Sequence, residues 1–246
     1  MKNLATQREN MQAQIGFRSP TPQSMYTEVA QRYDLLHSIL TFGLARQWHH
    51  KAARQLELPP KGRILDLATG TASLALAIAT VAPQDSLIIG GDINEQMLAV
   101  ARKRLQKSRS QTAIELKNFS AEALPFDDCL FDAVTMAFAL DDLKNRQVCL
   151  QEIFRVLKPD GQILILDLSL PDAPWMLSLY RIFLWFLPRI SHLFSEGNSS
   201  NLSEEILAYQ GRLAREELIK NTGFTQDRAH SLSGGLVTIH LARKPK

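Results

Sequence analysis

A regular alternation of short apolar runs with helical patterns constrains the fold of this chain most strongly, and it extends from Arg63 to Leu168. Short apolar runs bounded by turn residues are typical of buried strands, and the segments between them carry apolar residues at helical spacing. Strands that alternate with helices in this way form a parallel sheet with helices on both faces. The sequence therefore predicts an α/β protein built on a doubly wound sheet.

The expected elements continue to the end of the chain. Gly223 lies where the C-cap glycine of a late helix belongs, and a strand pattern follows it. The expected strands are 63–67, 87–92, 114–116, 131–136, 162–168, 224–229 and 235–242, and the expected helices are 73–81, 95–105, 143–157 and 213–221. This order predicts a seven-stranded, mostly parallel, Rossmann-like sheet rather than the six-stranded dinucleotide-binding sheet.

The length and composition indicate one domain. The chain has 246 residues, of which 45% are hydrophobic, and this suits a single α/β domain. We expect a flexible leader at 1–24 and one domain at 25–246. Within that domain, 25–58 is expected to form an N-terminal helical cap, because the pattern is helical from residue 26 to about 56. Residues 173–210 are expected to form an inserted lid.

Charge and cysteine content exclude several classes of protein. With 28 basic and 25 acidic residues the net charge is +3, which is too balanced for a nucleic-acid-binding protein with a clustered basic face. Cys129 and Cys149 are the only cysteines, so no disulfide framework is indicated and a reducing compartment fits. The leader has no apolar run of the kind found in signal peptides. We expect a cytoplasmic protein.

A loop of small residues, Asp66–Ala72, follows the first expected strand and opens the next helix. Such a loop lets the backbone approach a ligand at the crevice of a doubly wound sheet. Gly70 is its only glycine, so a cradle for pyrophosphate is not indicated. A tight turn beside an acidic strand end suits a ligand without phosphate, such as S-adenosylmethionine.

Two further loops belong to the same expected site. Asp92 ends the second strand, where a carboxylate can accept hydrogen bonds from both ribose hydroxyls, although an isolated Asp at a strand end is more often a cap or turn residue. After the third strand, the segment 119–126 offers Ser120 and Ala121 to an adenine edge, with apolar neighbours to cover the ring. Three such loops at consecutive strand ends predict a cofactor site.

With these segments the chain resembles the ubiquinone/menaquinone biosynthesis C-methyltransferases, from about Met25 onward. The motifs that carry the resemblance are Val29–Leu36, Phe42–Leu44, Leu65–Ala68, Gly91–Glu95, Ala121–Phe126 and, as the most specific, Leu232–Val237 with His240. The resemblance implies a class I S-adenosylmethionine-dependent methyltransferase that acts on a prenylated benzoquinol or naphthoquinol. The cofactor-binding residues predicted from the loops and the resemblance together are Asp66, Gly70, Thr71, Asp92, Ile93, Ser120, Ala121 and Ala137.

The chain departs from the family pattern in two motifs and in the segment Asn198–Tyr209, which is expected to face the acceptor. The family loop reads Gly-Thr-Gly-Asp, whereas Ala72 and Ser73 stand at its last two positions here. Ala72 is small, so we expect cofactor binding to survive. After the fourth strand the family carries Phe-Gly-Leu-Arg-Asn, and here Asp141 and Asp142 replace the cation and the amide. This second change falls on the side of the site that is expected to face the acceptor.

The chemistry of methyl transfer suggests the catalytic candidates. Transfer to a ring carbon is an in-line displacement, assisted by a general base that removes the proton of an adjacent hydroxyl. Asp141 and Asp142 are candidates for that base; alternatively Asp142 is the N-cap of the following helix. Tyr33 is a candidate hydrogen-bond donor to the acceptor oxygen, or else a packing residue. No metal site is predicted.

The apolar segment Trp175–Phe194 lies within the expected lid. Arg181, Pro188, Arg189 and His192 argue against a transmembrane span. The segment predicts a packed lid helix, or a lid that shelters a prenyl tail and contacts the inner face of the membrane transiently. A homodimer is also compatible with the sequence.

Two other functions are compatible with the sequence, and a third is disfavoured by it. The loss of the Arg-Asn pair favours methylation, including O-methylation, of another small aromatic or lipid-like acceptor. An assembly partner that binds the cofactor without catalysis would also retain Asp92 beside an altered acceptor side. An NAD dehydrogenase is disfavoured by the single glycine of the loop.

Overall fold

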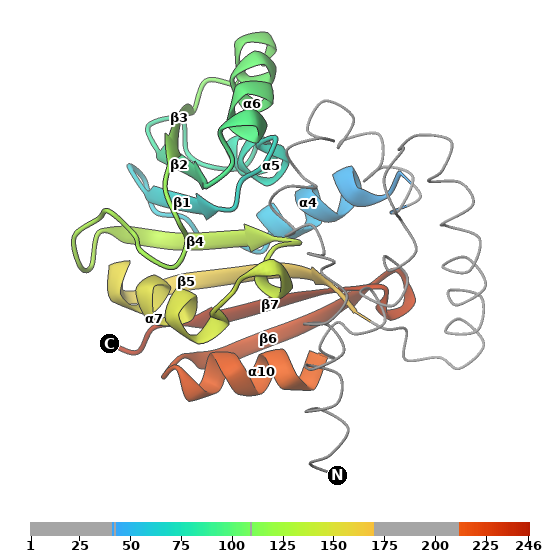
Figure 1. The fold of residues 1–246 in the computed structure, drawn as a ribbon, viewed down its shortest axis with the longest axis vertical. Helices are drawn as coiled ribbons and strands as arrows, with labels where there is room; N and C mark the ends of the chain where they lie inside the picture. Colours follow the sequence, from blue (N-terminus) through green and yellow to red (C-terminus); the bar gives the residue numbers. More distant parts are fainter. Residues whose placement is uncertain (1–40, 42, 109, 170–211) are drawn as a thin grey trace, which may run out of the picture.

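The computed structural model describes residues 41, 43–108, 110–169 and 212–246. Its centre is a seven-stranded sheet with the order β3-β2-β1-β4-β5-β7-β6 (Figure 1). The strands are β1 (Arg63–Leu67), β2 (Leu87–Asp92), β3 (Ala113–Asn118), β4 (Phe131–Ala137), β5 (Leu157–Leu168), β6 (Thr225–Leu232) and β7 (Val237–Arg243). Only β7 runs antiparallel to its neighbours. The predicted seven-stranded, mostly parallel sheet is therefore confirmed.

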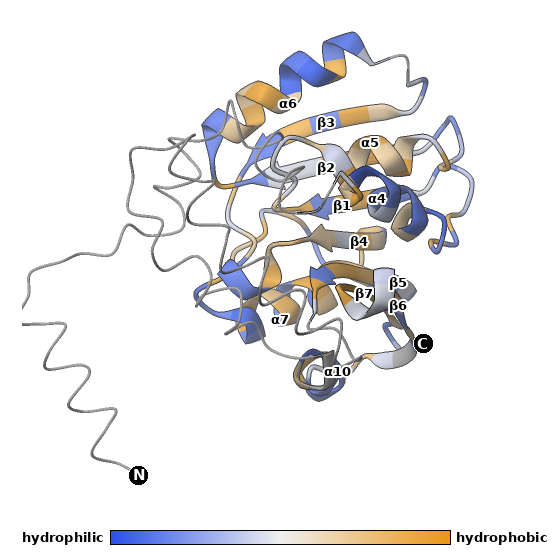
Figure 2. Cartoon of the chain, turned by 90° about the vertical axis from the view of Figure 1, so that its right-hand side faces the viewer, coloured by the Kyte–Doolittle hydropathy of each residue, from blue (hydrophilic) through white to orange (hydrophobic). Residues whose placement is uncertain are grey.

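Helices cover both faces of this sheet. They are α4 (Ala45–Ala53), α5 (Ser73–Ala79), α6 (Glu95–Lys107), α7 (Arg146–Val156) and α10 (Arg212–Asn221), with short 3-10 helices η1 (Leu140–Asp142) and η3 (Ser233–Gly235). One buried cluster joins α4 and α5 to the sheet through Trp48, Ile78 and Ile64, and a second joins α7 and α10 to the opposite face through Leu150 and Ile219. Figure 2 shows the apolar strands enclosed between helices whose outer faces are hydrophilic.

Side-chain caps explain where two of the helices begin. The amide oxygen of Asn94 accepts hydrogen bonds from the N–H groups of Gln96 and Met97 at 3.0 and 3.2 Å, and this begins α6. Asn145 accepts from the N–H of Val148 at 3.1 Å and begins α7 in the same way. The interpretation of Asp142 as the N-cap is therefore wrong, because Leu143 is extended and the helix begins three residues later than predicted.

Other boundaries also differ from the sequence prediction. Residues 158–161, between the expected helix 143–157 and the expected strand 162–168, are part of β5, where the register against β4 shifts and Asp160 adopts a left-handed φ of 65°. In the described part of the expected N-terminal cap, α4 covers nine residues and follows a turn at Thr41. Trp48 of α4 is buried and donates from Nε1 to Ser233 Oγ at 2.9 Å, so the N-terminal helix contacts the C-terminal motif.

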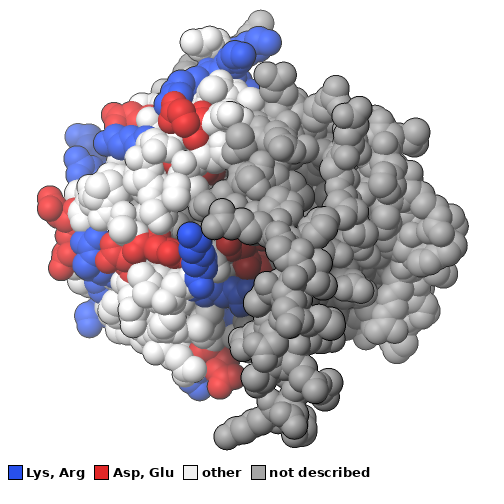
Figure 3. Space-filling model, in the orientation of Figure 1, with Lys and Arg blue, Asp and Glu red and all other residues white. Residues whose placement is uncertain are grey.

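The surface of the described chain carries both charge signs. Figure 3 shows basic and acidic side chains interspersed on the visible face, without a continuous basic area in the part of it that the structure describes. Among the described residues, no helix has the length and apolar character needed to cross a bilayer. Cys129 and Cys149 are both free thiols, the first exposed and the second buried.

Candidate active site

Asp66 braces the loop that follows β1. Its Oδ2 accepts from Thr69 Oγ1 at 2.6 Å, and its Oδ1 accepts from Thr135 Oγ1 of β4 at 2.7 Å. Burial raises the pKa of Asp66 to about 6, although the hydroxyls of Thr135 and Thr69 oppose the rise. Because internal donors occupy both oxygens, this carboxylate holds the loop and the adjacent strand in place.

Asp92 fixes the same loop against the end of β2. Its Oδ2 accepts from the N–H of Gly70 at 2.8 Å, and its Oδ1 accepts from the N–H of Asn94 at 2.8 Å. Burial raises the pKa of Asp92, while hydrogen bonds from the N–H groups of Asn94 and Gly70 oppose the rise. Each carboxylate oxygen can still accept a second hydrogen bond. Asp92 can therefore hold the loop and bind a ligand hydroxyl at the same time.

The loop stores backbone strain. Ala68, Gly70 and Ala72 have φ values of 48°, 53° and 63°, in the left-handed region that favours glycine. Such a conformation costs a non-glycine residue on the order of 1–3 kcal/mol and tends to occur at functional sites. Ala72 occupies the position where the family has glycine, so the turn is kept at some energetic cost.

A cavity of about 360 Å³, here called the β2 cavity, lies beside the end of β2. Its size is within the range of small-ligand sites. It brings together four of the predicted cofactor residues, Asp92, Ile93, Ser120 and Ala121, and its other lining residues are Ala68, Phe119, Glu122, Asp142, Leu143 and Lys144. Ile93 is 52% exposed, so its apolar side chain is accessible to a ligand in this cavity.

The ring of Phe119 lies directly on the backbone of β2. A Cβ at Gly91 would be 2.0 Å from Phe119 Cζ, so only glycine allows this contact. Phe119 in turn packs edge-to-face on Phe126 with a centroid separation of 5.2 Å, and Phe126 packs on Phe131 at 5.0 Å. These stacked rings support one wall of the β2 cavity.

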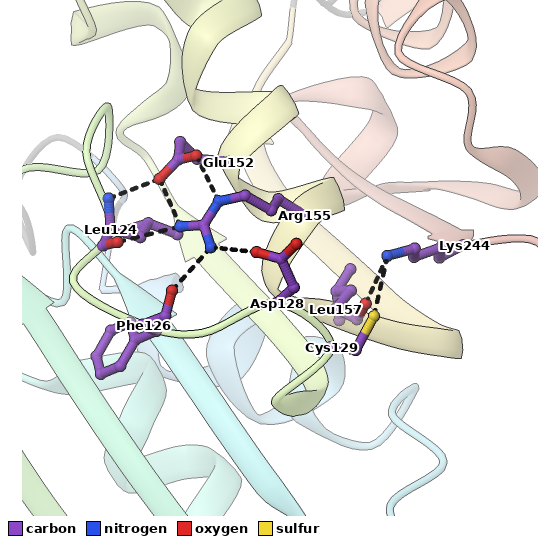
Figure 4. A network of polar contacts seen from close by, with 8 residues as sticks. All are labelled: Leu124, Phe126, Asp128, Cys129, Glu152, Arg155, Leu157 and Lys244. Atoms are coloured by element: carbon purple, nitrogen blue, oxygen red, sulfur yellow. Dashed lines mark hydrogen bonds and ion pairs between the residues drawn. The ribbon is translucent and has the colours of Figure 1, made fainter.

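Arg155 of α7 anchors the loop that carries Ser120 and Ala121 (Figure 4). Its guanidinium donates to the backbone oxygens of Phe126 and Leu124 at 2.8 and 3.1 Å, and to Asp128 Oδ1 at 2.7 Å. Glu152 pairs with Arg155 at 2.8 Å and accepts from the N–H of Leu124 at 2.8 Å. The hydrogen bond from Arg155 is the main reason why the pKa of Glu152 lies below its usual value.

We expect Arg155→Met to lower the free energy of unfolding by about 2 kcal/mol, because several charge-assisted hydrogen bonds are lost from a half-buried site. Affinity for S-adenosylmethionine should fall as well, because the loop over the β2 cavity loses its anchor. Urea unfolding and calorimetric titration measure the two effects. Arg102→Met is the matched control: Arg102 pairs with Glu95 on the exposed face of α6 and should change stability by less than about 0.5 kcal/mol.

A second, smaller cavity of about 40 Å³ lies beside the end of β1 and is here called the β1 cavity. It contains the remaining predicted cofactor residues, Asp66, Gly70, Thr71 and Ala137, together with His49, Ala68, Thr69, Ser73, Leu74 and Phe138. Since Ala68 lines both cavities, they meet at the loop. The predicted cofactor residues therefore line two neighbouring cavities that share Ala68.

Sequence reasoning missed two basic residues near the loop: His49, which lines the β1 cavity, and Arg104, which contacts two of its lining residues. Arg104 of α6 donates from Nη1 to Thr71 Oγ1 at 2.6 Å and to Ser73 Oγ at 2.9 Å, so it supports the altered end of the loop. His49 of α4 is buried and packs edge-to-face on Phe138 with a centroid separation of 5.6 Å. The pattern of α4 and α6 gives no signal for these contacts, because they depend on how the helices pack.

The structure separates the three catalytic candidates. Asp142 lines the β2 cavity together with Ser120 and Ala121. Asp141 points elsewhere: it is 4% exposed and forms an ion pair with Arg215 of α10, a residue that the sequence analysis did not select. Tyr33 lies outside the described residues, so its role stays a prediction.

The pKa of Asp66 predicts a pH dependence of stability. Because its folded pKa of about 6 exceeds the unfolded value near 3.8, its contribution is fully present below about pH 4 and is lost as pH rises through about 6. Relative to Asp66→Asn, the wild-type free energy of unfolding should fall by about 3 kcal/mol over this range. Urea unfolding between pH 4 and 7 measures the difference, and a difference that stays constant with pH would contradict the assignment.

Comparisons with known proteins agree with this geometry. The model of the ubiE/COQ5 methyltransferase family matches residues 16–244. A ubiquinone/menaquinone biosynthesis C-methyltransferase from Citrifermentans bemidjiense is 36% identical over 90% of this chain and 95% of its own. The enzyme of the same name from Syntrophotalea carbinolica is 38% identical over 88% and 91%.

The fold also matches solved structures. An S-adenosylmethionine-dependent methyltransferase from Aquifex aeolicus superposes with a TM-score of 0.60 at 17% identity, over 80% of this chain and 89% of its own. At this identity the likeness supports the fold alone. The match over nearly the whole chain and the identity to the two curated relatives go further: the chain belongs to the ubiE/COQ5 methyltransferase family and is an S-adenosylmethionine-dependent methyltransferase.

Proposed function

We propose that this protein methylates a ring carbon of a prenylated benzoquinol or naphthoquinol, with S-adenosylmethionine bound across the β1 and β2 cavities. The observation that carries the proposal is the convergence of all eight predicted cofactor residues on these two cavities, which share Ala68. The similarity to quinone-biosynthesis methyltransferases over about nine-tenths of the chain supports the choice of acceptor.

The residues present fit this cofactor. Asp92 ends β2 with a carboxylate that can accept hydrogen bonds from the ribose hydroxyls. Polar and apolar walls for the adenine are provided by Ser120, Ala121 and the exposed Ile93. Thr71 and Ala137 line the β1 cavity, and we assign them to the amino-acid end of the ligand. The loop has one glycine and no phosphate cradle, in agreement with a ligand that lacks phosphate.

Methyl transfer needs positioning more than covalent help from the protein. When bound, S-adenosylmethionine supplies an electrophilic methyl group on a sulfonium. This chain's residues would hold that cofactor, exclude water and accept the hydroxyl proton of the quinol, which otherwise leaves only at high pH. Asp141 is the better candidate for the base, because Asp142 lines the cavity assigned to the adenosine. Tyr33 and the lid expected at 173–210 fall outside the described residues, so their roles and any membrane contact stay predictions.

The test is a labelled-methyl assay. The purified protein is incubated with methyl-labelled S-adenosylmethionine and a 1,4-naphthoquinol or 1,4-benzoquinol that carries a short prenyl chain and an unsubstituted ring carbon. We expect label on the ring carbon of at least one quinol. Tight cofactor binding without transfer to either quinol would overturn the proposed acceptor.

One observation favours a second candidate, methylation of a different small aromatic or lipid-like acceptor. A buried ion pair with Arg215 occupies the position where the family carries an Arg-Asn pair, so the electrostatics on the acceptor side have changed. Methylation of a phenolic oxygen in a panel of non-quinol phenols, with no label on the quinol ring carbons, would support this candidate instead.

A further inference from the structure

We propose that Asp141, Asp167 and Arg215 form one buried proton-accepting cluster for the methyl transfer. Asp141 takes the hydroxyl proton of the acceptor, and Arg215 is the positioning residue that holds Asp141 in place. The inference rests on the proposed function for its acceptor, and it adds two residues, Asp167 and Arg215, that no motif of the sequence points to.

The three side chains meet at the carboxyl ends of β4 and β5. Arg215 of α10 is fully buried; it donates from Nη1 to the backbone oxygen of Leu168 at 2.7 Å and from Nη2 to Asp141 Oδ2. Its Nε lies 3.8 Å from Asp167 Oδ2 of β5. Because Asp167 is 2% and Asp141 4% exposed, two buried carboxylates share one buried guanidinium.

The cluster has unused hydrogen-bonding capacity. Asp141 Oδ1, Asp167 Oδ2 and Arg215 Nε are buried and have no hydrogen-bond partner among the residues that the structure describes. Buried polar atoms of native proteins are nearly always satisfied by protein, water or ligand. Asp167 Oδ2 and Arg215 Nε face each other at 3.8 Å, and Asp141 Oδ1 lies 3.6 Å from Arg146, so among the described residues these atoms have charged neighbours beyond hydrogen-bond distance. Asp141 Oδ1 therefore keeps the capacity to accept a hydrogen bond from a further polar group.

The charges make this cluster a better base than a lone aspartate. One fully buried cation cannot neutralise two buried carboxylates, so the pair favours the uptake of one proton. In agreement, burial raises the pKa of Asp167 to about 7, with Arg215 opposing the rise and Asp141 and Asp142 adding to it. A general base works best when its pKa lies near the operating pH.

The other described groups around Asp167 are few. Arg146 of α7 lies 3.6 Å from Asp141 Oδ1 and is 28% exposed, so solvent screens its charge. His240 of β7 follows Thr238, the cross-strand partner of Asp167, by two residues and shares its face of the sheet. These groups and Asp142 set the electrostatic surroundings in which the cluster titrates.

In the proposed step, a proton moves from the acceptor to Asp141 while a methyl group moves from sulfur to carbon. The O–H proton of the quinol passes to Asp141 Oδ1 as the ring carbon next to that oxygen attacks the methyl group. The new C–C bond forms while the methyl–sulfur bond breaks, and its electron pair stays on sulfur to give the thioether product. The ring carbon then loses its own proton to water, which restores the aromatic ring with a phenolate oxygen, and the cluster returns its proton to that oxygen, so that one proton is released for each methyl group transferred.

The test combines activity with direct titration. For Asp141→Asn we expect kcat to fall about 100-fold, with the affinity for S-adenosylmethionine within about twofold of wild type. For Asp167→Asn, the midpoint of the rising limb of kcat/KM should move down by about one pH unit, because the cluster loses the buried carboxyl whose pKa is raised to about 7. Arg215→Lys keeps the positive charge but loses the planar guanidinium with its several N–H donors. We therefore expect kcat to fall about tenfold, while the KM for the acceptor and the midpoint of the pH profile change little.

The control is Asp132→Asn, which removes the Lys158 ion pair at the opposite end of β4 and should leave the pH profile unchanged. Carboxyl carbon NMR of aspartate-labelled protein follows the cluster without any acceptor, so it separates this inference from the choice of substrate. We expect one carboxyl to titrate near pH 7 in the wild type and none in Asp167→Asn. No such titration, a pH profile that Asp167→Asn leaves in place, or full activity in Asp141→Asn would overturn the proposal.

Discussion

Replacing Gly91 with alanine is expected to destabilise the protein by about 3 kcal/mol and to lower its affinity for S-adenosylmethionine at least about tenfold. The added Cβ would lie 2.0 Å from Phe119 Cζ and 2.4 Å from Cε2, closer than any real contact. The ring has to move away from β2, and it lines the β2 cavity beside Ser120. One added methyl group on β2 should therefore disturb the cavity wall that is proposed to contact the adenine of the cofactor.

A double variant separates this clash from the general cost of alanine in a strand. In a Phe119→Ala background the clash is gone, so adding Gly91→Ala should cost less than about 1 kcal/mol. Urea unfolding gives the stability of the four proteins in the cycle, and calorimetric titration with S-adenosylmethionine gives their affinities. Equal costs of Gly91→Ala in the two backgrounds would show that the ring contact is not the cause.

Replacing Asp92 with alanine should weaken S-adenosylmethionine binding about 100-fold. The variant loses the proposed hydrogen bonds to the ribose, each worth about 1.5–3 kcal/mol when the acceptor is charged. It also loses the hydrogen bonds that hold Gly70 and Asn94 at 2.8 Å, so the loop is less ordered before the ligand arrives.

The matched control for Asp92 is Asp132→Ala. Like Asp92, Asp132 accepts a hydrogen bond from a backbone N–H group. Its donor is Arg63 of the neighbouring strand β1, at 2.8 Å. Asp132 lies at the amino end of β4, away from both cavities. We expect a loss of stability in the control with unchanged cofactor affinity. Similar losses of affinity in both variants would mean that Asp92 acts only through the fold.

The donor side of the site was predictable because it depends on local rules. A strand, a tight turn of small residues and a helix succeed one another within a short stretch, and parallel strands bring their carboxyl ends to the same edge. Asp92, Ser120 and Thr71 therefore converge wherever such a sheet forms, and the structure places them in two cavities that share Ala68.

The acceptor side was not predictable because its contacts span the chain. Asp141 and Asp142 look alike in sequence, yet a 3-10 turn directs one toward Arg215, 74 positions further along the chain, and places the other in the β2 cavity. The N-cap prediction for Asp142 was wrong because Asn145, three residues later, caps α7. The apolar periodicity of α10 gives no sign that Arg215 is buried, because an arginine in a helix is usually exposed to solvent.

The sequence by itself determined the order of strands and helices, the family and the set of residues at the cofactor loops, because apolar periodicity and turn chemistry act over a few neighbouring residues. Only the tertiary structure decided that Phe119 requires a glycine at position 91, that Arg155 anchors the neighbouring loop, and that the two adjacent aspartates have different partners. Those outcomes depend on packing between elements distant in sequence, where burial and the proximity of opposite charges set the energies.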